Sequence, residues 1–367
     1  MKNSFGSSIT ITLFGESHGE YIGAVLDGLA PGIKINRDYI CAKLDLRRPG
    51  GKISTSRIEG DDFSIVSGMY DGYTTGTPLC ILIPNTGKKS SDYESLADTP
   101  RPGHADYAAG CKYHGFEDKR GGGHFSGRIT AALVAAGAIL QYALEKKDIY
   151  VGSHITELHG AYDRPFEDYK ADIALLSERK FPTLDERAEE KMVKEIEKAA
   201  SLGDSVGGIL ETAIIGVPSG VGEPWFDTVE SMLSHALFSV PAVKGVEFGL
   251  GFAFADVYGS EGNDPFVMDN GEVVTLTNNN GGINGGITNG MPIIFRCAIK
   301  PTPSIFKEQM TVSLSENVNK TMKIQGRHDP AIIHRARAVI DAVSAIVVAD
   351  MLTVRYGTDY LATKENK

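Results

Sequence analysis

The chain has 367 residues, with 37 Lys and Arg against 47 Asp and Glu, so its formal net charge is -10. A hydrophobic share of 42% is enough for a sizeable core and excludes a chain that is disordered throughout. The acidic balance disfavours general nucleic-acid binding, because duplex affinity comes mostly from phosphate neutralisation by Lys and Arg. If the protein handles anions, its basic residues must be concentrated locally.

No apolar run reaches the roughly 20 residues that span a bilayer, and no signal-peptide pattern precedes the polar turn at residues 15–18. The four cysteines are scattered and form no CxxC pair, so neither a disulfide framework nor a thiolate zinc site is indicated. We therefore expect a soluble, cytoplasmic protein without a membrane or nucleic-acid partner.

Strand-like patterns dominate the first hundred residues. Alternating apolar residues predict strands over 9–13, 22–27 and 79–83. A short helix over 38–46 would carry Arg47 and Arg48 at its end.

The rest of the chain alternates between helices and strands. We predict a buried helix capped by Ser126 and running to about residue 144, and a charged surface helix over about 184–202. A third helix should begin at Asp329-Pro330, with Asp at the N-cap and one apolar face, and end near residue 357. Further strands are expected at residues 209–217, 246–257 and 293–299.

The chain shows no internal repeat, no Pro/Ser-rich linker and no abrupt change of composition. We therefore expect one α+β domain over residues 1–367, with antiparallel sheets packed on helices.

Glycine is enriched, at 42 of 367 residues, against an average of about 7%. Glycine runs mark tight turns or places where the backbone approaches a ligand closely. The segment 278–286 contains two such pairs between apolar strands, and we interpret it as close backbone packing around a flat or anionic ligand.

Polar clusters in glycine- and proline-rich turns are the best candidates for a functional site. They are GESHG at 15–19, RRPGGK at 47–52, RPGHAD at 101–106, GGGHFSGR at 121–128 and GRHDP at 326–330. The last two lead into helices, whose N-terminal N–H groups and positive dipole end favour anions. Each of these two also has an Arg able to bind a phosphate or carboxylate with two hydrogen bonds.

Two of the nine histidines have the surroundings of catalytic groups. His18 and His104 lie between small residues in polar loops, where a side chain can reach a ligand and exchange a proton near neutral pH. A structural role is the default for His114, His154, His159, His235 and His334.

Taken together, the clusters resemble one family, the chorismate synthases. The match consists of GESHG with Gly23 and Asp27-Gly28, RPGHADY, the Gly-Ser-x-Arg helix start, DSVGG at 204–208, PAVKGVE at 241–247, GGINGGI, KPTPS at 300–304 and GRHDP. These motifs follow the family's order from residue 6 to about 355.

The resemblance implies a β-α-β sandwich, with helices layered between antiparallel sheets, and a homotetramer. It implies the anti 1,4-elimination of phosphate from 5-enolpyruvylshikimate 3-phosphate, giving chorismate. Reduced FMN is the implied cofactor, without net redox change. NADPH is a candidate reductant, but no further domain is evident, so we favour an external flavin reductase.

The resemblance also implies roles for particular residues. Its catalytic set is His18, His104, Asp329, Ser17 and Ser126. FMN contacts would fall on His124, Phe125, Ser126, Pro241, Ala242, Gly285, Lys300, Pro301, Thr302, Pro303, Ser304 and Arg327, and a nicotinamide nucleotide on Arg47. Substrate would be bound by Arg48, Lys52, Arg101, Arg128 and Arg327.

Three positions depart from the commoner family pattern. His124-Phe125 stands where Arg-Ser is usual, which replaces a permanent cation beside the flavin by a titratable ring. Lys52 replaces an Arg and binds an anion less well in the bidentate manner. Asp341 stands where a Glu is usual.

Two other functions fit the residues less well. A metal-dependent phosphohydrolase could use His18, His104, His328, Asp106 and Asp329, but these lack any fixed ligand spacing. A non-catalytic flavin- or anion-binding protein would retain its function without His18 and His104.

Overall fold

The computed structural model describes residues 2–50, 53, 60–86, 98–324 and 328–362. Within these residues, two antiparallel five-stranded sheets form the framework. The first sheet has the strand order β1 (Ser4–Phe5), β2 (Thr10–Gly15), β3 (Tyr21–Asp27), β7 (Leu79–Pro84) and β4 (Ser64–Ser67). The second has the order β11 (Val243–Phe248), β16 (Ile293–Ile299), β10 (Gly208–Ile215), β8 (Tyr150–Leu158) and β9 (Ala161–Tyr162).

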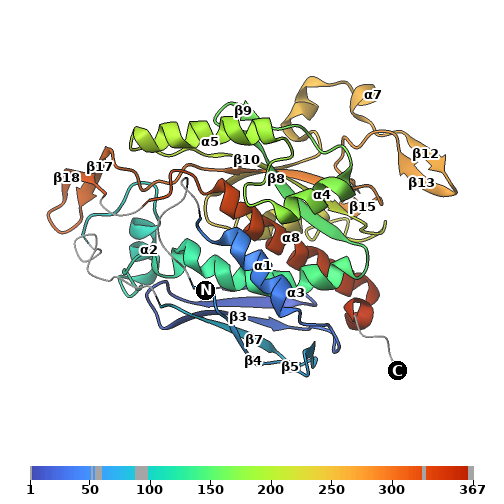
Figure 1. Cartoon of the computed structure of the whole chain (residues 1–367), viewed down its shortest axis with the longest axis horizontal. Helices are drawn as coiled ribbons and strands as arrows, with labels where there is room; N and C mark the ends of the chain where they lie inside the picture. The colour runs from blue at the N-terminus through green and yellow to red at the C-terminus, as the bar shows by residue number, and fades with distance from the viewer. Residues whose placement is uncertain (1, 51–52, 54–59, 87–97, 325–327, 363–367) are drawn as a thin grey trace.

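Three helices lie between these sheets, namely α1 (Arg37–Arg47), α3 (Thr130–Glu145) and α8 (Ile333–Tyr356) (Figure 1). Helix α3 contacts β3 and β7 of the first sheet, whereas α8 contacts β8 and β10 of the second. The layers therefore run from sheet through helices to sheet, and the α+β class is confirmed. Helices α4 (Tyr169–Glu178) and α5 (Glu186–Ser201) form a further layer, with α4 against β8 and β10 and α5 against β9.

The remaining elements are short. The helices are α2 (Asp106–Tyr113), α6 (Val229–Leu237), α7 (Gly259–Gly262) and the 3-10 turns η2 (Gly123–Phe125), η3 (Gly127–Ile129), η4 (Gly251–Asp256) and η5 (Thr358–Leu361). Four two-stranded pairs are β5 (Met69–Tyr70) with β6 (Tyr73–Thr74), β12 (Phe266–Asp269) with β13 (Glu272–Thr275), β14 (Ile283–Asn284) with β15 (Ile287–Thr288) and β17 (Glu308–Ser313) with β18 (Val318–Lys323).

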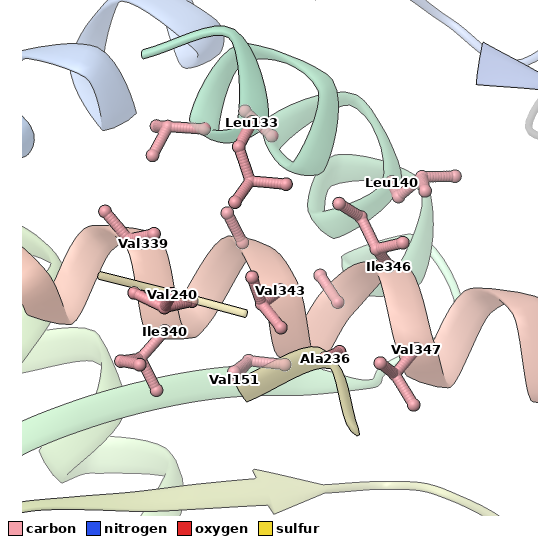
Figure 2. Packing of buried hydrophobic residues seen from close by; sticks show 14 of the residues in the cluster. Leu133, Leu140, Val151, Ala236, Val240, Val339, Ile340, Val343, Ile346 and Val347 are labelled. Carbon is pink, nitrogen blue, oxygen red and sulfur yellow. The ribbon is translucent and has the colours of Figure 1, made fainter. Parts of the chain in front are cut away.

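Helices α3 and α8 form the centre of the core. Both are buried on nearly every face, and side chains of α3 such as Leu133 reach towards Val343 and Ile346 of α8 (Figure 2). A Cβ at Gly137 would lie 2.5 Å from the Cβ of Ala342, so this glycine lets the two helices approach closely. In the described part of the chain, 127–145 is the one helix long and apolar enough to cross a membrane, but 89% of its apolar window is buried, as in a core helix.

The third predicted helix differs from its prediction in two ways. Helix α8 begins at Ile333, not at Asp329-Pro330, because the Asp329 carboxylate is bonded to Arg335 and does not cap the helix. The predicted single apolar face is also wrong, since α8 is enclosed by α1, α3, α6 and the second sheet. The predicted strand over 246–257 ends at Phe248, and the 3-10 turn η4 follows it.

Candidate functional site

A cavity of about 1060 Å³ opens where the loops of both halves of the chain meet. Its lining combines the GESHG turn, the RPGHAD and GGGHFSGR loops, the end of α6 and the loop after β16. Twelve of the residues expected at a functional site line it: Ser17, His18, Arg101, His104, His124, Phe125, Ser126, Pro241, Ala242, Lys300, Thr302 and Pro303. The fold thus brings together motifs that are almost 300 residues apart in the sequence.

His18 is held at the centre of a tight turn between β2 and β3. The turn is closed by a hydrogen bond from the Gly19 N–H to the Glu16 carbonyl at 3.0 Å. Ser17 Oγ lies 3.1 Å from His18 Nδ1, which orients the ring. Gly121 has φ +70°, and a Cβ there would lie 2.4 Å from His18 Cε1, so a glycine is required for this approach.

His104 also lines the cavity and is held by residues of the loop after β16. Its Nε2 lies 2.7 Å from Ser304 Oγ, and Lys300 Nζ donates to the carbonyl of neighbouring Gly103 at 2.7 Å. Burial and then the positive charge of Arg101 lower the pKa of His104 to about 4, although Asp106 opposes this shift. The free site therefore holds a neutral His104 ring at pH 7.

Arg101 is fixed by Asp106 in a bidentate pair, with Nε donating at 2.8 Å and NH2 at 2.7 Å. The same NH2 group also donates to the Gly121 carbonyl at 2.9 Å. Arg101 therefore connects the RPGHAD loop, which carries His104, to the glycine run that packs against His18.

The GGGHFSGR segment forms η2 and η3 before α3 begins. His124 Nδ1 donates to the Gly15 carbonyl at 2.7 Å, because a carbonyl can only accept. The Phe125 ring is 44% exposed and packs edge-on to Tyr113, with centroids 6.1 Å apart. Ser126 caps the 3-10 turn η3 by accepting from the Arg128 N–H. It does not cap the long helix as predicted, because α3 starts at Thr130 with Ile129 at its N-cap.

A second polar cluster lies beside the cavity around Asp61, whose side chain is fully buried. Its Oδ2 lies 3.5 Å from Arg47 NH2 and 3.3 Å from Arg48 Nε, and its Oδ1 is bonded to Arg128 NH1. Arg128 Nε donates to Asn85 Oδ1 at 3.0 Å. Arg48 also pairs with the exposed Asp45. The cluster thus gathers three guanidinium groups in one place, and guanidinium groups are suited to binding phosphate and carboxylate.

Some expected residues do not line the cavity. Arg47, Arg48 and Arg128 belong to the Asp61 cluster, Asp329 pairs with Arg335 at 2.7 Å, and Ser304 reaches the site only through His104. Among the described residues, Pro301 and Gly285 also fall outside the lining. Lys52 and Arg327 lie outside the described residues.

The segment 278–286 packs closely against other parts of the chain. A Cβ at Gly281 or Gly282 would clash with the backbone of Gly249 or Pro292. Asp264 accepts hydrogen bonds from the backbone N–H groups of Asn279 and Asn280 at 2.7 and 2.8 Å. The expected close backbone packing is thus present within the chain, and packing around a ligand stays a prediction. Gly285 lies in an exposed hairpin turn with φ +60°.

The cavity fits a phosphate-bearing flavin in size and chemistry. The buried Thr302 Oγ1 has no hydrogen-bond partner and lies in the cavity wall, where a ligand can satisfy it. Lys300 and Arg101 supply positive charge, and Phe125 and Pro303 supply apolar surface. In contrast, the described residues contain no group of three or more His, Cys, Asp or Glu placed to hold a metal, so the phosphohydrolase alternative has no ligand set there.

Sequence reasoning missed the groups that hold the predicted residues in place. Asp61 and Asn85 have no motif of their own, and their importance comes from contacts with distant arginines and turns. Arg335 lies within a predicted helix and belongs to no motif, although it donates hydrogen bonds to both the Asp329 carboxylate and the Arg47 carbonyl. Asp106 was named within the RPGHAD motif, but its pairing with Arg101 was not predicted.

Comparisons with known proteins agree with one another. A family model described as chorismate synthase matches residues 9–353. A chorismate synthase of Pyrococcus abyssi is 49% identical over 350 residues, covering 95% of this chain and 97% of the relative. One of Thermococcus gammatolerans is 47% identical over 351 residues, with the same two coverages. A crystal structure of chorismate synthase superposes with a TM-score of 0.75 at 27% identity and covers 97% of this chain and 95% of that one.

Proposed function

The chain belongs to the chorismate synthase family, and from this premise we propose that the cavity between His18 and His104 is its active site. The family reaction, in the shikimate pathway, is the anti 1,4-elimination of phosphate from 5-enolpyruvylshikimate 3-phosphate to chorismate, catalysed by a lyase that requires reduced FMN. The observation that carries the proposal is the meeting of two oriented histidines and a set of cations in one cavity of about 1060 Å³.

We assign the proton that accompanies the departing phosphate to His18. Its ring is oriented by Ser17 and enclosed by Gly121, which is the fixed geometry that general acid catalysis needs. The guanidinium groups around Asp61, including those of Arg48 and Arg128, would bind the phosphate and carboxylates of the substrate. Lys52 remains in the proposed substrate set.

His104 would act on the flavin side of the cavity. Reduced FMN, when bound, would supply the transient electron density that the departure of phosphate requires and a base for the ring proton. The flavin would be held by residues 124–126, 241–242 and 300–304, with Arg327 and Gly285 completing the proposed set. A ligand with a negative phosphate raises the pKa of a nearby imidazole, so binding would prepare His104 to carry a proton.

The Asp329 carboxylate pairs with Arg335 and does not line the cavity. Ile332, three residues further on, does line the cavity. We propose that Asp329 contributes to catalysis when ligand binding draws this short segment towards the cavity.

For the reductant, we propose an external flavin reductase. Arg47, the residue expected to contact a nicotinamide nucleotide, is only 3% exposed and packs against Asp61. NADPH would therefore have to disrupt a buried ion cluster to reach it.

We also propose that the whole chain, residues 1–367, is one catalytic domain with the family's β-α-β sandwich, working in the cytoplasm as a homotetramer. One continuous hydrophobic core supports the single domain. The four unpaired cysteines fit a reducing compartment. Exposed aromatic side chains around η4, α7 and β12, namely Phe252, Tyr258 and Phe266, support an interface between subunits.

The test of the proposed site compares His18→Ala and His104→Ala with the parent protein, using chemically reduced FMN without oxygen. General acid-base groups contribute about 10²- to 10⁴-fold to rate, so each variant should lose turnover by that factor. His159→Ala, a change at an exposed histidine, is the matched control and should keep full turnover. Full activity of both active-site variants would refute the assignment.

A further inference from the structure

Asn85, directly after β7, connects three parts of the site. Its backbone N–H donates to the Glu20 carbonyl at 3.0 Å, which extends the pairing of β7 with β3 by one residue. Its side chain is 9% exposed and turns towards the site. None of the sequence motifs includes this residue, and the reaction described above gives it no role.

The side-chain amide of Asn85 clamps the turn that carries His18 at both ends. Nδ2 donates to the Glu16 carbonyl at 3.0 Å and to the Gly19 carbonyl at 3.1 Å. Glu16 and Gly19 are the first and last residues of this turn, and Ser17 and His18 are its two central residues. Both amide hydrogens of Asn85 are thus used to fix the backbone on either side of His18.

The remaining polar atom of the amide connects the turn to the arginine cluster. Oδ1 accepts from Arg128 Nε at 3.0 Å, and Arg128 is in turn bonded to buried Asp61. The orientation of the amide follows from these partners, because a flipped amide would set donor against donor at Arg128.

We propose that Asn85 is a positioning residue that holds the His18 turn in register with the Arg128–Asp61 pair. A displacement of about 1 Å in a reacting group can cost about 10²-fold in rate, so a clamp on this turn has kinetic consequences. The inference rests on the proposed role of His18.

Two substitutions distinguish the bonds from Asn85 to the His18 turn from its bond to Arg128. Asn85→Asp keeps an acceptor for Arg128 but turns an oxygen towards the Glu16 and Gly19 carbonyls, whereas Asn85→Ala removes every bond. Both variants should lower kcat by about 10- to 100-fold with KM changed less than about threefold. A near-normal kcat in Asn85→Asp would mean that the clamp on the turn has no kinetic role, and would overturn the proposal.

A structural control is available in the same half of the chain. Thr74 is 4% exposed, and its hydroxyl accepts from the Ile33 N–H and donates to the Ala30 carbonyl. Thr74→Val should lower the melting temperature without changing kcat per folded molecule. An equal loss of kcat in Thr74→Val would show that the Asn85 effect is only loss of stability.

A double-mutant cycle distinguishes failure of this inference from failure of the proposed function. In the His18→Ala background, Asn85→Ala should add little further loss of kcat, because it acts through His18. Fully additive losses would refute the positioning role and leave the role of His18 standing.

A second readout is independent of turnover. The ring ¹⁵N signals of His18, assigned by their disappearance in His18→Ala, should broaden or split in both Asn85 variants and stay sharp in Thr74→Val. If His18→Ala alone left turnover unchanged, the role of His18 would fail, and these signals would still decide whether Asn85 holds its ring. Unchanged signals in both variants would overturn the proposal.

Discussion

Ser304 Oγ lies 2.7 Å from Nε2 of His104, a residue 200 positions earlier in the chain. This hydrogen bond joins the loop after β16 to the RPGHAD loop and fixes the His104 ring at the cavity wall. Ser304, the last residue of the KPTPS motif, thus orients His104, a role that the composition of the motif does not indicate.

The His104 ring should titrate near pH 4 in the free protein, because burial and Arg101 disfavour its cationic form. Since this folded pKa lies below the unfolded value of about 6.5, stability is retained above that value and falls as pH drops from 6.5 towards 4. Titration of ring ¹⁵N signals measures the pKa, and addition of FMN should raise it. A midpoint at or above 6.5 in the free protein would contradict this account.

Asp61→Asn should weaken the fold, because Arg47 and Arg128 lose their shared buried counter-charge. Removing one member of a buried ion pair costs about 3–5 kcal/mol, which urea denaturation can measure. Inorganic phosphate should stabilise this variant more than the parent, since it replaces the missing negative charge. Asp45→Asn, at an exposed partner of Arg48, is the control and should have little effect. Equal stability of the Asp61 variant and its parent would exclude the cluster as we describe it.

His124→Arg should bind FMN more tightly than the parent, because it places a permanent cation in the cavity wall. The substitution also removes the hydrogen bond to the Gly15 carbonyl, so His124→Gln serves as the control for loss of the imidazole. Fluorescence titration with FMN measures both. Weaker or unchanged binding by the Arg variant, relative to the parent, would argue against a charge effect at this position.

His154 should make the free energy of unfolding decrease as pH rises. Burial alone would lower its pKa, but hydrogen bonds to Asp163 at 2.9 Å and Glu211 at 3.4 Å outweigh burial and raise it. Glu211 also pairs across the sheet with Arg296, which pairs in turn with Glu247. Both ring nitrogens face carboxylates, so the geometry favours the cation.

A raised folded pKa means that this stability is present below the unfolded value of about 6.5 and is lost as pH rises through the folded pKa. The free energy of unfolding should therefore decline as pH rises above about 6.5, and His154→Gln should remove that slope. His159→Gln, at a ring whose side chain is 61% exposed, should keep it. A slope unchanged in His154→Gln would show that this ring is not the titrating group.

The sequence predicted a helix or strand correctly where the burial of its side chains in the fold follows the periodicity of its apolar residues. Strand β16 occupies residues 293–299 as expected, because its alternating side chains face a core on one side only. Helix α5 starts after the cap Asp185 and buries Ala188, Met192 and Ile196, as its charged outer face indicated. In contrast, the enclosure of α8 on all sides depends on neighbours from both halves of the chain.

Some residues of the candidate site could be predicted from the sequence, and others could not. His18, His104 and Ser126 could be found because glycine- and proline-rich turns leave a local signal around them. Asp61 and Asn85 could not, since each is bonded to Arg128, which lies more than 40 positions away in the chain. Gly285 was named from the family resemblance alone, and its hairpin turn lies outside the cavity lining in the part of the chain that the structure describes.

Anaerobic turnover tests the central claim most directly. The protein is mixed with 5-enolpyruvylshikimate 3-phosphate and chemically reduced FMN, and chorismate absorbance and free phosphate are followed together. The account predicts equal amounts of the two products, unaffected by EDTA and absent with oxidised FMN. Release of phosphate without chorismate, or no product from folded protein that binds FMN, would contradict it.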